Sequence, residues 1–565
     1  MRPIHHEHLD FLSKVDRLAS STEAAAVDRD ALDHREEKAC MYSLGRVTAV
    51  SGAQMTVEAD QPLASSVRIG AMIKTRSVDH EVVGTISAVE VDGGSPTRSV
   101  FVVDLLGEIV ASAEGHSEFR RGVSHYPISG APVRDATDAD LRTIYTRPSV
   151  ANVGIGTLFH DPTRQAFVVV DELLAKHFAV IGSTGSGKSC GVALILSAVL
   201  ASHPQAHIVV LDPHNEYATA FGDLAEVVNV DNLQLPLWLL DLEEAAGVLI
   251  RGGTVQEQEA QAIILKDAIV RARRHYATNG LAAASITVDT PAPFGVPDLL
   301  RFIDEAMGRL DNPDNSAPYL RLRTRLESLR DDRRFAFMFS DWLVTRDTLS
   351  QIVGRLLRIP VDGKPITVID LSGIPTEIAD VVVSLTCRLT FDFSLWSERE
   401  RRPPVLVVCE EAHRYVPAAE SVGFAAAARA ITRIAREGRK YGVALALISQ
   451  LPSELSPQAL SQCGTVFALR LGHYLDQRFM ATALPDAARG MLASLPSMRT
   501  QEAIVFGEGV RLPMHIRFDD LPLERRPRSD SAQFSKAWQT ESADVEFLAE
   551  GIRRWRQQTR KPATG

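Results

Sequence analysis

A glycine-rich stretch between two apolar segments carries the clearest chemical signal in the sequence. Residues 182–189, GSTGSGKS, match the pattern GxxxxGKS without a mismatch. Backbone N–H groups converge on phosphate oxygens only where side chains do not block the approach, so the pattern needs its glycines. Lys188 would reach the β- and γ-phosphates, and the Ser189 hydroxyl would bind Mg²⁺. The pattern predicts a site for a nucleoside triphosphate.

The segments on either side of this stretch support the assignment. A short apolar run precedes it and an apolar helical run follows it, as a phosphate-binding loop requires, so a chance loop of glycine and serine is disfavoured. The helix would also direct the positive end of its dipole at the phosphates. We therefore expect nucleotide contacts from Gly182, Ser183, Thr184, Gly185, Ser186, Gly187, Lys188, Ser189 and Cys190.

Two adjacent carboxylates follow another apolar segment. Glu410 and Glu411 come directly after VLVVC, which is typical of a buried strand. Two acids at the carboxyl end of such a strand are electrostatically costly unless a cation and a substrate lie nearby. We expect Glu410 to hold the water shell of Mg²⁺ and Glu411 to orient and polarise the attacking water. An exposed acidic helix cap is the alternative.

Polar residues also end two other apolar segments. Ser449 and Gln450 follow VALALI, and the Gln450 amide is placed to sense a γ-phosphate unless it belongs to an ordinary polar turn. Asp212 and His214 end the segment HIVVLDPH. The sequence leaves open whether His214 belongs to a site or to a surface turn.

An arginine-rich segment, ARAITRIAREGRKYG, follows the acid pair. Arg429, Arg433 and Arg436 recur at i, i+4 and i+7, which places them on one face of a helix, and Arg439 follows at its end. A solvated cationic face near a helix C-terminus is one explanation. The other is that an arginine reaches a nucleotide bound by a neighbouring subunit and stabilises charge on the phosphoryl group in transfer.

Strands and helices must alternate to bring these groups together. The apolar segments AVIG, HIVVLD, PITVID, VLVVC, VALALIS and TVFALRL, separated by helices, predict a parallel sheet covered on both faces. This sheet would form the core of an α/β domain over residues 149–240 and 361–523. Residues 241–360 interrupt the series with helical periodicity and predict a mostly helical insertion.

The two ends of the chain have different patterns. Residues 39–148 contain short segments rich in Val, Ile and Thr between turns, which predict a small β-barrel or sandwich. Residues 1–38 are polar and charged with a possible helix, and residues 524–565 read as a polar linker followed by a helix.

Composition narrows the class of protein. The net charge of −10 gives no global basic signature of nucleic-acid binding, although a local basic channel can still bind DNA. The five cysteines are scattered without a CxxC pair, which favours a reducing compartment over a zinc or disulfide framework. With no membrane-length apolar run and no signal-peptide pattern, we expect a cytoplasmic protein without membrane contact.

These segments together resemble the HerA family of hexameric ATPases, in the wider group that includes the FtsK-type DNA pumps. The resemblance rests on KHFAVIGSTGSGKS, LDPHNEY, VIDLSGIP, CEEAHRYVP, RIAREGRKYGVALALISQLPSELSP and LASLPSMRTQEAIVFGEG, in this order. It implies an α/β fold with a RecA-like P-loop NTPase core, a mostly helical insertion and a preceding HAS-barrel-like domain. It also implies a homo-hexameric ring around double-stranded DNA that uses ATP and Mg²⁺ to translocate.

The resemblance also implies roles for individual residues. Lys188 and Ser189 match the phosphate and Mg²⁺ positions, Glu410 and Glu411 the metal and catalytic acids, Gln450 the sensor, and Arg436 or Arg439 the finger that acts in trans. The chain departs from the family pattern at three positions. Asn215 replaces a glycine, Glu410 replaces an Asp found in many relatives, and Leu451 replaces an arginine near the sensor.

Family members typically work with an effector protein. The resemblance implies a NurA-like nuclease, another nuclease or a sirtuin-like protein docked near the N-terminal barrel, in DNA end processing or anti-phage defence. This chain has no nuclease constellation of its own, so a partner would do any cutting. The leading interpretation is an ATP-dependent DNA translocase or helicase. The alternative, which the acidic charge balance favours, is an ATP-assembled ring scaffold that switches an effector, with DNA transport secondary.

Overall fold

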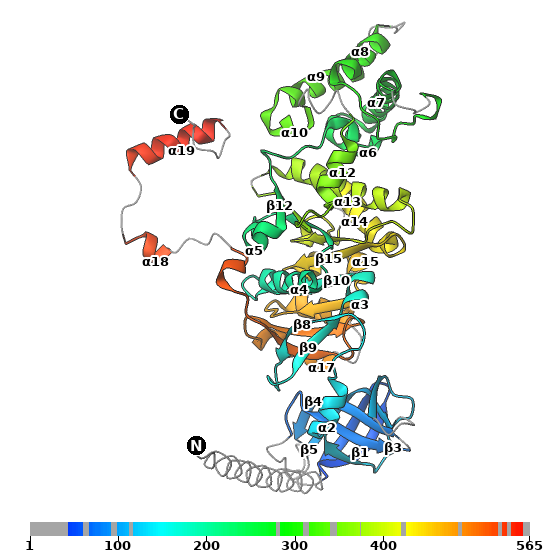
Figure 1. Ribbon diagram of the computed structural model, residues 1–565, viewed down its shortest axis with the longest axis vertical. Coiled ribbons are helices and arrows are strands. Elements are labelled where there is room, and N and C mark those ends of the chain that lie inside the picture. Colours follow the sequence, from blue (N-terminus) through cyan, green and yellow to red (C-terminus); the bar gives the residue numbers. More distant parts are fainter. Residues whose placement is uncertain are drawn as a thin grey trace, which may run out of the picture.

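In the computed structural model a barrel, a sheet domain and a helical region follow one another along the long axis of the molecule (Figure 1). The predicted N-terminal segment, residues 1–38, lies outside the described residues. The structure describes residues 43–59, 67–78, 80–91, 99–111, 117–277, 283–308, 316–339, 347–372, 374–419, 425–483, 489–528, 534–539 and 544–557.

The first unit is a closed β-barrel, which decides between the two predicted architectures. Its strands follow the order β2-β1-β7-β3-β4-β5, and pairing of β5 with β2 closes the ring, while β6 extends β5. Alternate side chains fill the interior, as closure of a small barrel requires, among them Val57, Ile73, Val82 and Phe101. The strands are β1 (Gly45–Ser51), β2 (Gln54–Ala59), β3 (Met72–Ser77), β4 (His80–Val91), β5 (Ser99–Ala111), β6 (Ser117–Arg121) and β7 (Pro132–Asp135).

The second unit is built on an eleven-stranded sheet with the order β12-β13-β11-β14-β15-β10-β16-β17-β18-β8-β9. In this spatial order, the first seven strands, which end with β16, are parallel to one another. The pairings from β16 onward, through β17, β18, β8 and β9, are antiparallel. The parallel strands are β10 (Phe178–Ile181), β11 (His207–Asp212), β12 (Ala225–Val228), β13 (Ile366–Asp370), β14 (Val405–Cys409), β15 (Val443–Ser449) and β16 (Thr465–Ala468). The antiparallel strands are β8 (Asn152–Leu158), β9 (Gln165–Val169), β17 (Glu502–Gly507) and β18 (Met514–Phe518).

The predicted parallel strands are thus confirmed, and four antiparallel strands that the sequence pattern did not reveal extend the sheet. The strands β8 and β9, like β17 and β18, are joined directly by short connections, and antiparallel strands need no crossover helix between them. The alternation of strand and helix that signals a parallel sheet is absent from these stretches of the chain.

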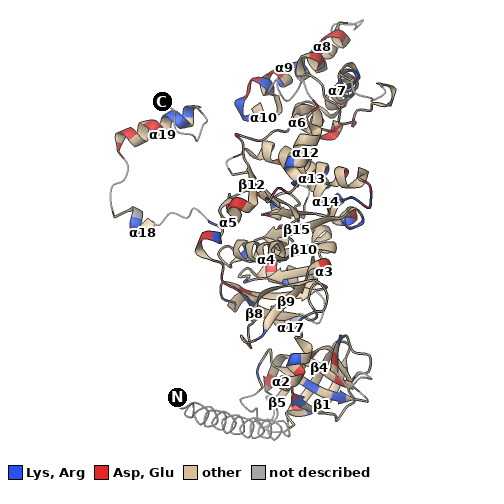
Figure 2. Cartoon of the chain, viewed as in Figure 1, with Lys and Arg blue, Asp and Glu red and all other residues tan. Residues whose placement is uncertain are grey.

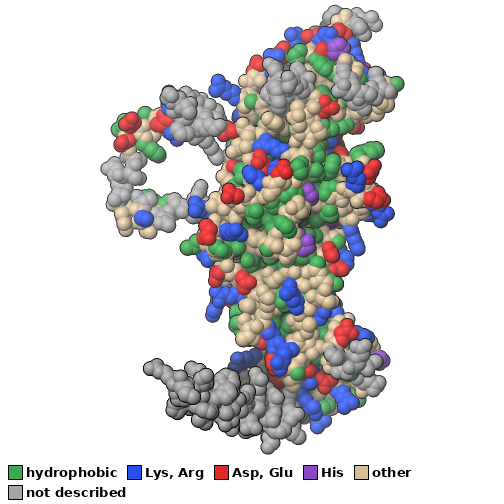
Figure 3. All heavy atoms as spheres, in the orientation of Figure 1, with side chains coloured by type: hydrophobic (Ala, Val, Ile, Leu, Met, Phe, Trp, Pro, Cys, Tyr) green, Lys and Arg blue, Asp and Glu red, His purple; other side chains and the backbone are tan. Residues whose placement is uncertain are grey.

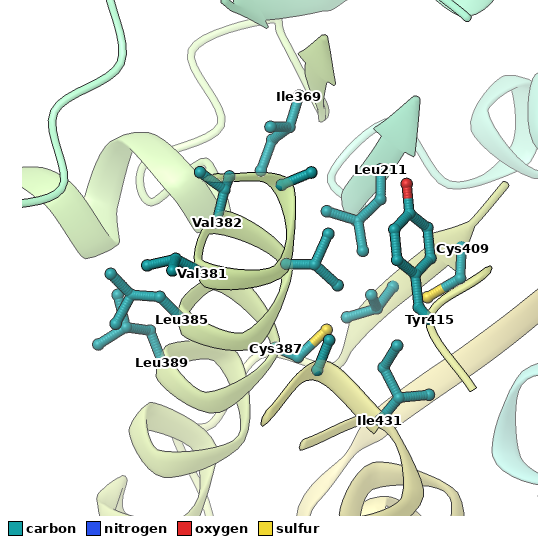
Figure 4. Close-up of a cluster of buried hydrophobic side chains, with 14 of the residues drawn as sticks. Leu211, Ile369, Val381, Val382, Leu385, Cys387, Leu389, Cys409, Tyr415 and Ile431 are labelled. Carbon is teal, nitrogen blue, oxygen red and sulfur yellow. The ribbon is translucent and has the colours of Figure 1, made fainter. Parts of the chain in front are cut away.

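Helices cover both faces of the parallel half. In β10, Phe178 and Val180 pack against α4 (Lys188–Ser202) on one face, while Ala179 and Ile181 belong to the core on the other face. That second face is covered by α13 (Thr376–Trp396) and α14 (Ala425–Glu437). Figure 4 shows Cys387 of α13 directed toward Cys409 of β14. Successive residues of a strand thus serve two separate cores, which is why the strands are apolar throughout.

The helical region lies at the end of the molecule away from the barrel (Figure 1). Residues of both charge signs lie in this region (Figure 2). Capping boxes start α6 and α7, where Asp241 pairs with Glu244 and Thr254 pairs with Glu257. The helices are α6 (Leu242–Leu249), α7 (Val255–His275), α8 (Val296–Met307), α9 (Ala317–Asp331), α10 (Ala336–Phe339) and α12 (Leu349–Leu357).

The C-terminal arm leaves the body of the molecule (Figure 1). It comprises the turn η11 (Leu523–Arg525) and the helices α18 (Phe534–Ala537) and α19 (Val545–Gln557). Large apolar side chains of the arm are exposed, among them Trp538, Phe547 and Trp555. Within the described ranges no helix combines the length and the apolar character needed to cross a membrane.

The barrel contacts the antiparallel half of the sheet. Ile144 of α2 (Asp138–Ile144) shares an apolar cluster with Leu512 of the sheet domain and with barrel residues. The fully buried Asp104 of β5 accepts a hydrogen bond from the Gly490 N–H. Charged side chains of both signs are interspersed over the face of the molecule in Figure 3.

Candidate functional site

The glycine-rich loop lies between β10 and α4, and its backbone needs its glycines. Gly185 and Gly187 have φ angles of 72° and 104°, in the left-handed region that favours glycine. A Cβ on Gly182 would lie 2.7 Å from Ser186 Oγ and 2.8 Å from Leu469 Cβ. The pattern recognised in the sequence thus reflects loop geometry as well as space for a phosphate.

Three separate segments hold this loop in place. The Gly182 N–H donates to the Ser449 carbonyl at 3.2 Å, and the Ser183 N–H donates to the Arg470 carbonyl at 2.8 Å. The Gln501 N–H donates to the Ser186 carbonyl at 3.1 Å. The sequence motif gave no signal for the contribution of Gln501, which is more than 300 residues away.

The side chains of the loop point in different directions. Lys188 is buried, and its Nζ donates to the Ser183 carbonyl at 3.3 Å, so the ammonium group folds back over the loop. The Ser186 hydroxyl is buried and has no hydrogen-bond partner within the described residues. Ser189 and Cys190 belong to the first turn of α4, whose N–H groups have no partner in a preceding helical turn.

The order of the strands brings the predicted groups together. Neighbouring strands β14, β15 and β10 are parallel, so their carboxyl ends lie at the same edge of the sheet. The acids follow β14, Ser449 ends β15 with Gln450 directly after it, and the phosphate loop follows β10. Glu410 and Glu411 are buried, which excludes the exposed helix cap considered from the sequence.

Glu410 has a partner that sequence reasoning missed. The hydroxyl of the fully buried Tyr217 donates to Glu410 Oε2 at 2.8 Å. Burial raises the pKa of Glu410 to about 8, and the negative charge of Glu411 acts in the same direction, while Tyr217 and Lys188 oppose it. Tyr217 ends the motif LDPHNEY, and its place in that motif is the one feature of the sequence that points to a role in the site.

Glu411 stands in an unusual backbone conformation between two imidazoles. Its φ of 53° lies in the left-handed region, which a residue other than glycine or asparagine adopts at a cost. His214 Nε2 lies 3.6 Å from Oε1, and His413 Nδ1 lies 3.3 Å from Oε2. Burial lowers the pKa of His413, which favours a neutral imidazole at pH 7. Of the two possibilities for His214, the structure favours the site.

Gln450 contacts the phosphate loop directly. The Thr184 hydroxyl donates to Gln450 Oε1. Ser449, which precedes it, is fully buried. An amide in this position touches the loop from the strand between the loop and the acids, where a γ-phosphate sensor is expected.

The turn after β11 is organised by a buried carboxylate. Asp212 accepts hydrogen bonds from the N–H groups of His214 at 3.1 Å and Tyr217 at 2.9 Å, and burial raises its pKa. Asn215 has a φ of 54°. Asparagine tolerates this left-handed conformation better than most residues, which explains why it can replace the glycine of the family pattern.

The four arginines near α14 divide into two pairs. Arg429 forms an ion pair with Glu243 at 2.9 Å, and Arg433 forms one with Asp392 at 3.3 Å and lies over the Phe391 ring. Arg436 is exposed and donates only to the neutral Gln458 within the described parts of the chain. Arg439 is exposed in the turn η7 (Gly438–Tyr441).

Comparison with known proteins shows which family this chain resembles. Residues 153–390 match the family model described as Helicase HerA, central domain. The DNA double-strand break repair helicase HerA of Pyrococcus furiosus is 26% identical over 477 residues, which cover 78% of this chain and 81% of that protein. The chain is thus similar to HerA proteins over most of its length.

A second HerA protein matches over nearly all of its length. The DNA double-strand break repair helicase HerA of Sulfurisphaera tokodaii is 24% identical over 543 residues, covering 89% of this chain and 98% of that protein. Among solved structures, VirB4 of Thermoanaerobacter pseudethanolicus gives a TM-score of 0.47 at 17% identity, covering 67% of this chain and 98% of that one. The plasmid coupling protein TrwB in complex with ADP and Mg²⁺ gives a TM-score of 0.45 at 15% identity, and the match covers 70% of this chain and 94% of that one.

The HerA central domain contains the phosphate loop but ends before the acids. Its match stops at residue 390, whereas Glu410, Glu411 and Gln450 come later in the chain and reach the loop through the parallel sheet. With the loop and the buried acid pair at one edge of the sheet, this chain, which is similar to HerA helicases, is an ATPase.

Proposed function

We propose that this ATPase is a DNA translocase or helicase that works as a six-membered ring and requires Mg²⁺. The observation that carries the proposal is the buried pair Glu410–Glu411 at the end of β14. Only β15 separates β14 from β10, the strand that leads into the phosphate loop. The names of the HerA relatives, which describe DNA double-strand break repair helicases, support the choice of DNA.

The residues present fit a nucleotide with a divalent cation. The loop from Gly182 to Ser189, with Cys190, would surround the phosphates through backbone N–H groups, and Lys188 would add its charge. Ser189 and Glu410 would provide the oxygen atoms that Mg²⁺ prefers. A buried carboxylate with a raised pKa is the kind of group that a cation stabilises in its ionised form.

Hydrolysis needs a group that positions water, and Glu411 fits this role. Its Oε2 is buried and has no hydrogen-bond partner within the described residues, so it remains available to accept a proton from an attacking water. Gln450 would register the γ-phosphate from the adjacent strand. Arg436 or Arg439 would approach the nucleotide of a neighbouring subunit, because Arg429 and Arg433 already have acidic partners in their own chain.

DNA would be bound through phosphate contacts that do not depend on sequence, and such contacts weaken with salt. The test is the ATPase rate of the purified oligomer with and without double-stranded DNA at several salt concentrations. Stimulation by duplex DNA that declines as salt rises would support translocation. A rate indifferent to DNA at every salt concentration would overturn it.

A ring scaffold that controls an effector is the second candidate, and the net charge of −10 favours it. The effector would be a NurA-like nuclease, another nuclease or a sirtuin-like protein docked near the barrel, in DNA end processing or anti-phage defence. An ATPase rate that rises with the copurifying effector but not with duplex DNA would favour the scaffold.

A further inference from the structure

The imidazole of His413 lies between two side-chain oxygens. One belongs to Glu411, which follows β14, and the other belongs to Ser449, which ends β15. Its Nδ1 is 3.3 Å from Glu411 Oε2 and 3.2 Å from Ser449 Oγ. One ring nitrogen makes a well-aligned hydrogen bond to one of these atoms at a time. In this structure the aligned partner is Ser449, and Glu411 Oε2 has no hydrogen bond within the described residues. His413 therefore has two alternative partners within reach of the same atom.

Ser449 connects this imidazole to the sensor. Ser449 is fully buried, and its Oγ accepts a hydrogen bond from the Leu451 N–H at 3.1 Å. Gln450 lies between these two residues, and its Oε1 accepts a hydrogen bond from the Thr184 hydroxyl. A movement of Gln450 relative to the phosphate loop would therefore change the position of Ser449 Oγ, the group to which His413 is bonded.

We propose that His413 is a positioning residue that couples Gln450 to Glu411, a role that rests on the hydrolytic function proposed above. When Gln450 meets a γ-phosphate, Ser449 shifts, His413 turns its Nδ1 toward Oε2, and the Glu411 carboxylate is fixed for water. When Gln450 rests on Thr184, His413 stays with Ser449. His413 thus links detection of triphosphate to the readiness of the base.

His214 provides a natural comparison on the same carboxylate. Its Nε2 lies 3.6 Å from Oε1 of Glu411, but it comes from the turn after β11 and its side chain is 48% exposed. Among the described residues it has no hydrogen bond to Ser449. The two imidazoles therefore offer similar chemistry to Glu411, and only His413 joins it to the sensor strand.

The test measures single-turnover phosphate release and ATP affinity in the full-length protein. His413→Ala should lower the rate about 10-fold or more while ATP affinity changes less than about twofold, because the base is misplaced but the loop is intact. His413→Asn, which keeps a polar nitrogen near the Nδ1 position, should recover part of the rate. In a Glu411→Gln background, His413→Ala should cost less than about twofold, because its effect passes through Glu411.

A double-mutant cycle separates coupling from general damage. Ser449→Ala combined with His413→Ala should be no slower than His413→Ala alone, whereas Ser449→Ala combined with His214→Ala should be additive. Should His413→Ala fail to fold, His413→Asn enters both cycles in its place. An undiminished effect of the His413 substitution in the Glu411→Gln background, full additivity with Ser449→Ala, or an unchanged rate would overturn the proposal. Wild-type protein that binds ATP and never releases phosphate would instead overturn the hydrolytic function itself.

Discussion

Tyr217 Oη donates a hydrogen bond to Glu410 Oε2 at 2.8 Å, and this contact joins the turn after β11 to the acid pair after β14. Both groups are buried, so neither exchanges the other for water. The phenol stabilises the ionised form of Glu410, which is the form able to bind a cation.

Tyr217→Phe should therefore weaken the use of Mg²⁺. Loss of a hydrogen bond to a charged, buried group costs about 1.5–3 kcal/mol, so the Mg²⁺ concentration for half-maximal ATPase should rise by a factor between about 10 and 150. Titration of the ATPase rate with Mg²⁺ measures this shift. Tyr441→Phe, whose ring packs on Phe391 away from the acids, is the matched control and should follow the wild-type curve.

Lys188→Ala should abolish tight ATP binding. The buried ammonium group at the loop is the only side-chain cation that the GxxxxGKS pattern places at the phosphates, and nothing in the loop replaces it. Nucleotide titration measures the affinity. Lys176→Ala, which removes a lysine paired with Glu172 just before β10, should bind ATP normally. Retained affinity in Lys188→Ala would refute the assignment of the phosphate site.

Glu411→Gln should bind ATP and hydrolyse it at least ~100-fold more slowly, because an amide cannot accept the proton of the attacking water. Single-turnover phosphate release measures the chemical step apart from binding. The substitution keeps the shape of the side chain, so the melting temperature should remain close to that of the wild type. A rate near the wild-type value would exclude Glu411 as the base.

Arg436→Ala or Arg439→Ala subunits should regain activity when mixed with Lys188→Ala subunits. Each parent would supply what the other lacks if the arginine acts on the neighbouring subunit's nucleotide. The ATPase rate across mixing ratios, in oligomers shown to be mixed, measures the recovery. Arg429→Ala breaks the ion pair with Glu243 and is the control, since it should retain most activity without mixing. Absence of recovery at any ratio would make Arg436 and Arg439 structural.

Acid should destabilise the protein through His515. Burial lowers the pKa of His515 from 6.5 to about 4, and the nearby Glu502 only partly opposes this. The unfolded chain therefore binds a proton at a higher pH than the folded one, and stability falls as the pH drops from about 6.5 toward 4. The loss between pH 7 and pH 5 should be about 2 kcal/mol.

The measurement is the melting temperature as a function of pH. His515→Gln should flatten the decline between pH 7 and pH 5, because the glutamine does not titrate. The control, His473→Gln, removes an imidazole that is 66% exposed and should leave the decline unchanged. An equally steep decline in His515→Gln would assign the acid sensitivity to other groups.

The sequence predicted contiguous motifs well. It did not predict contacts between residues that the fold brings together from distant parts of the chain. The phosphate loop and the acid pair could be located because each is a contiguous motif at the end of an apolar strand. Tyr217, His413 and Gln501 could not be assigned roles, because their partners Glu410, Ser449 and Ser186 lie on other elements. The antiparallel half of the sheet was missed for a related reason, since short hairpins leave no helical spacer in the pattern.

The arginine-rich segment shows a further limit. Spacing at i, i+4 and i+7 placed Arg429, Arg433 and Arg436 on one helix face, but the acidic partners Glu243 and Asp392 come from distant parts of the chain. The structure shows that Arg429 and Arg433 have acidic partners, whereas no ion pair of Arg436 is seen among the described residues.

The hydrogen bond from the Gln501 N–H to the Ser186 carbonyl has a practical consequence for work with fragments of the chain. A fragment limited to residues 153–390 would carry Lys188 but lack Glu410, Glu411, Gln450 and this brace from the far side of the sheet. The segment that matches the family model therefore lacks part of the candidate site. Inactivity of such a fragment would not show that the intact chain is inactive.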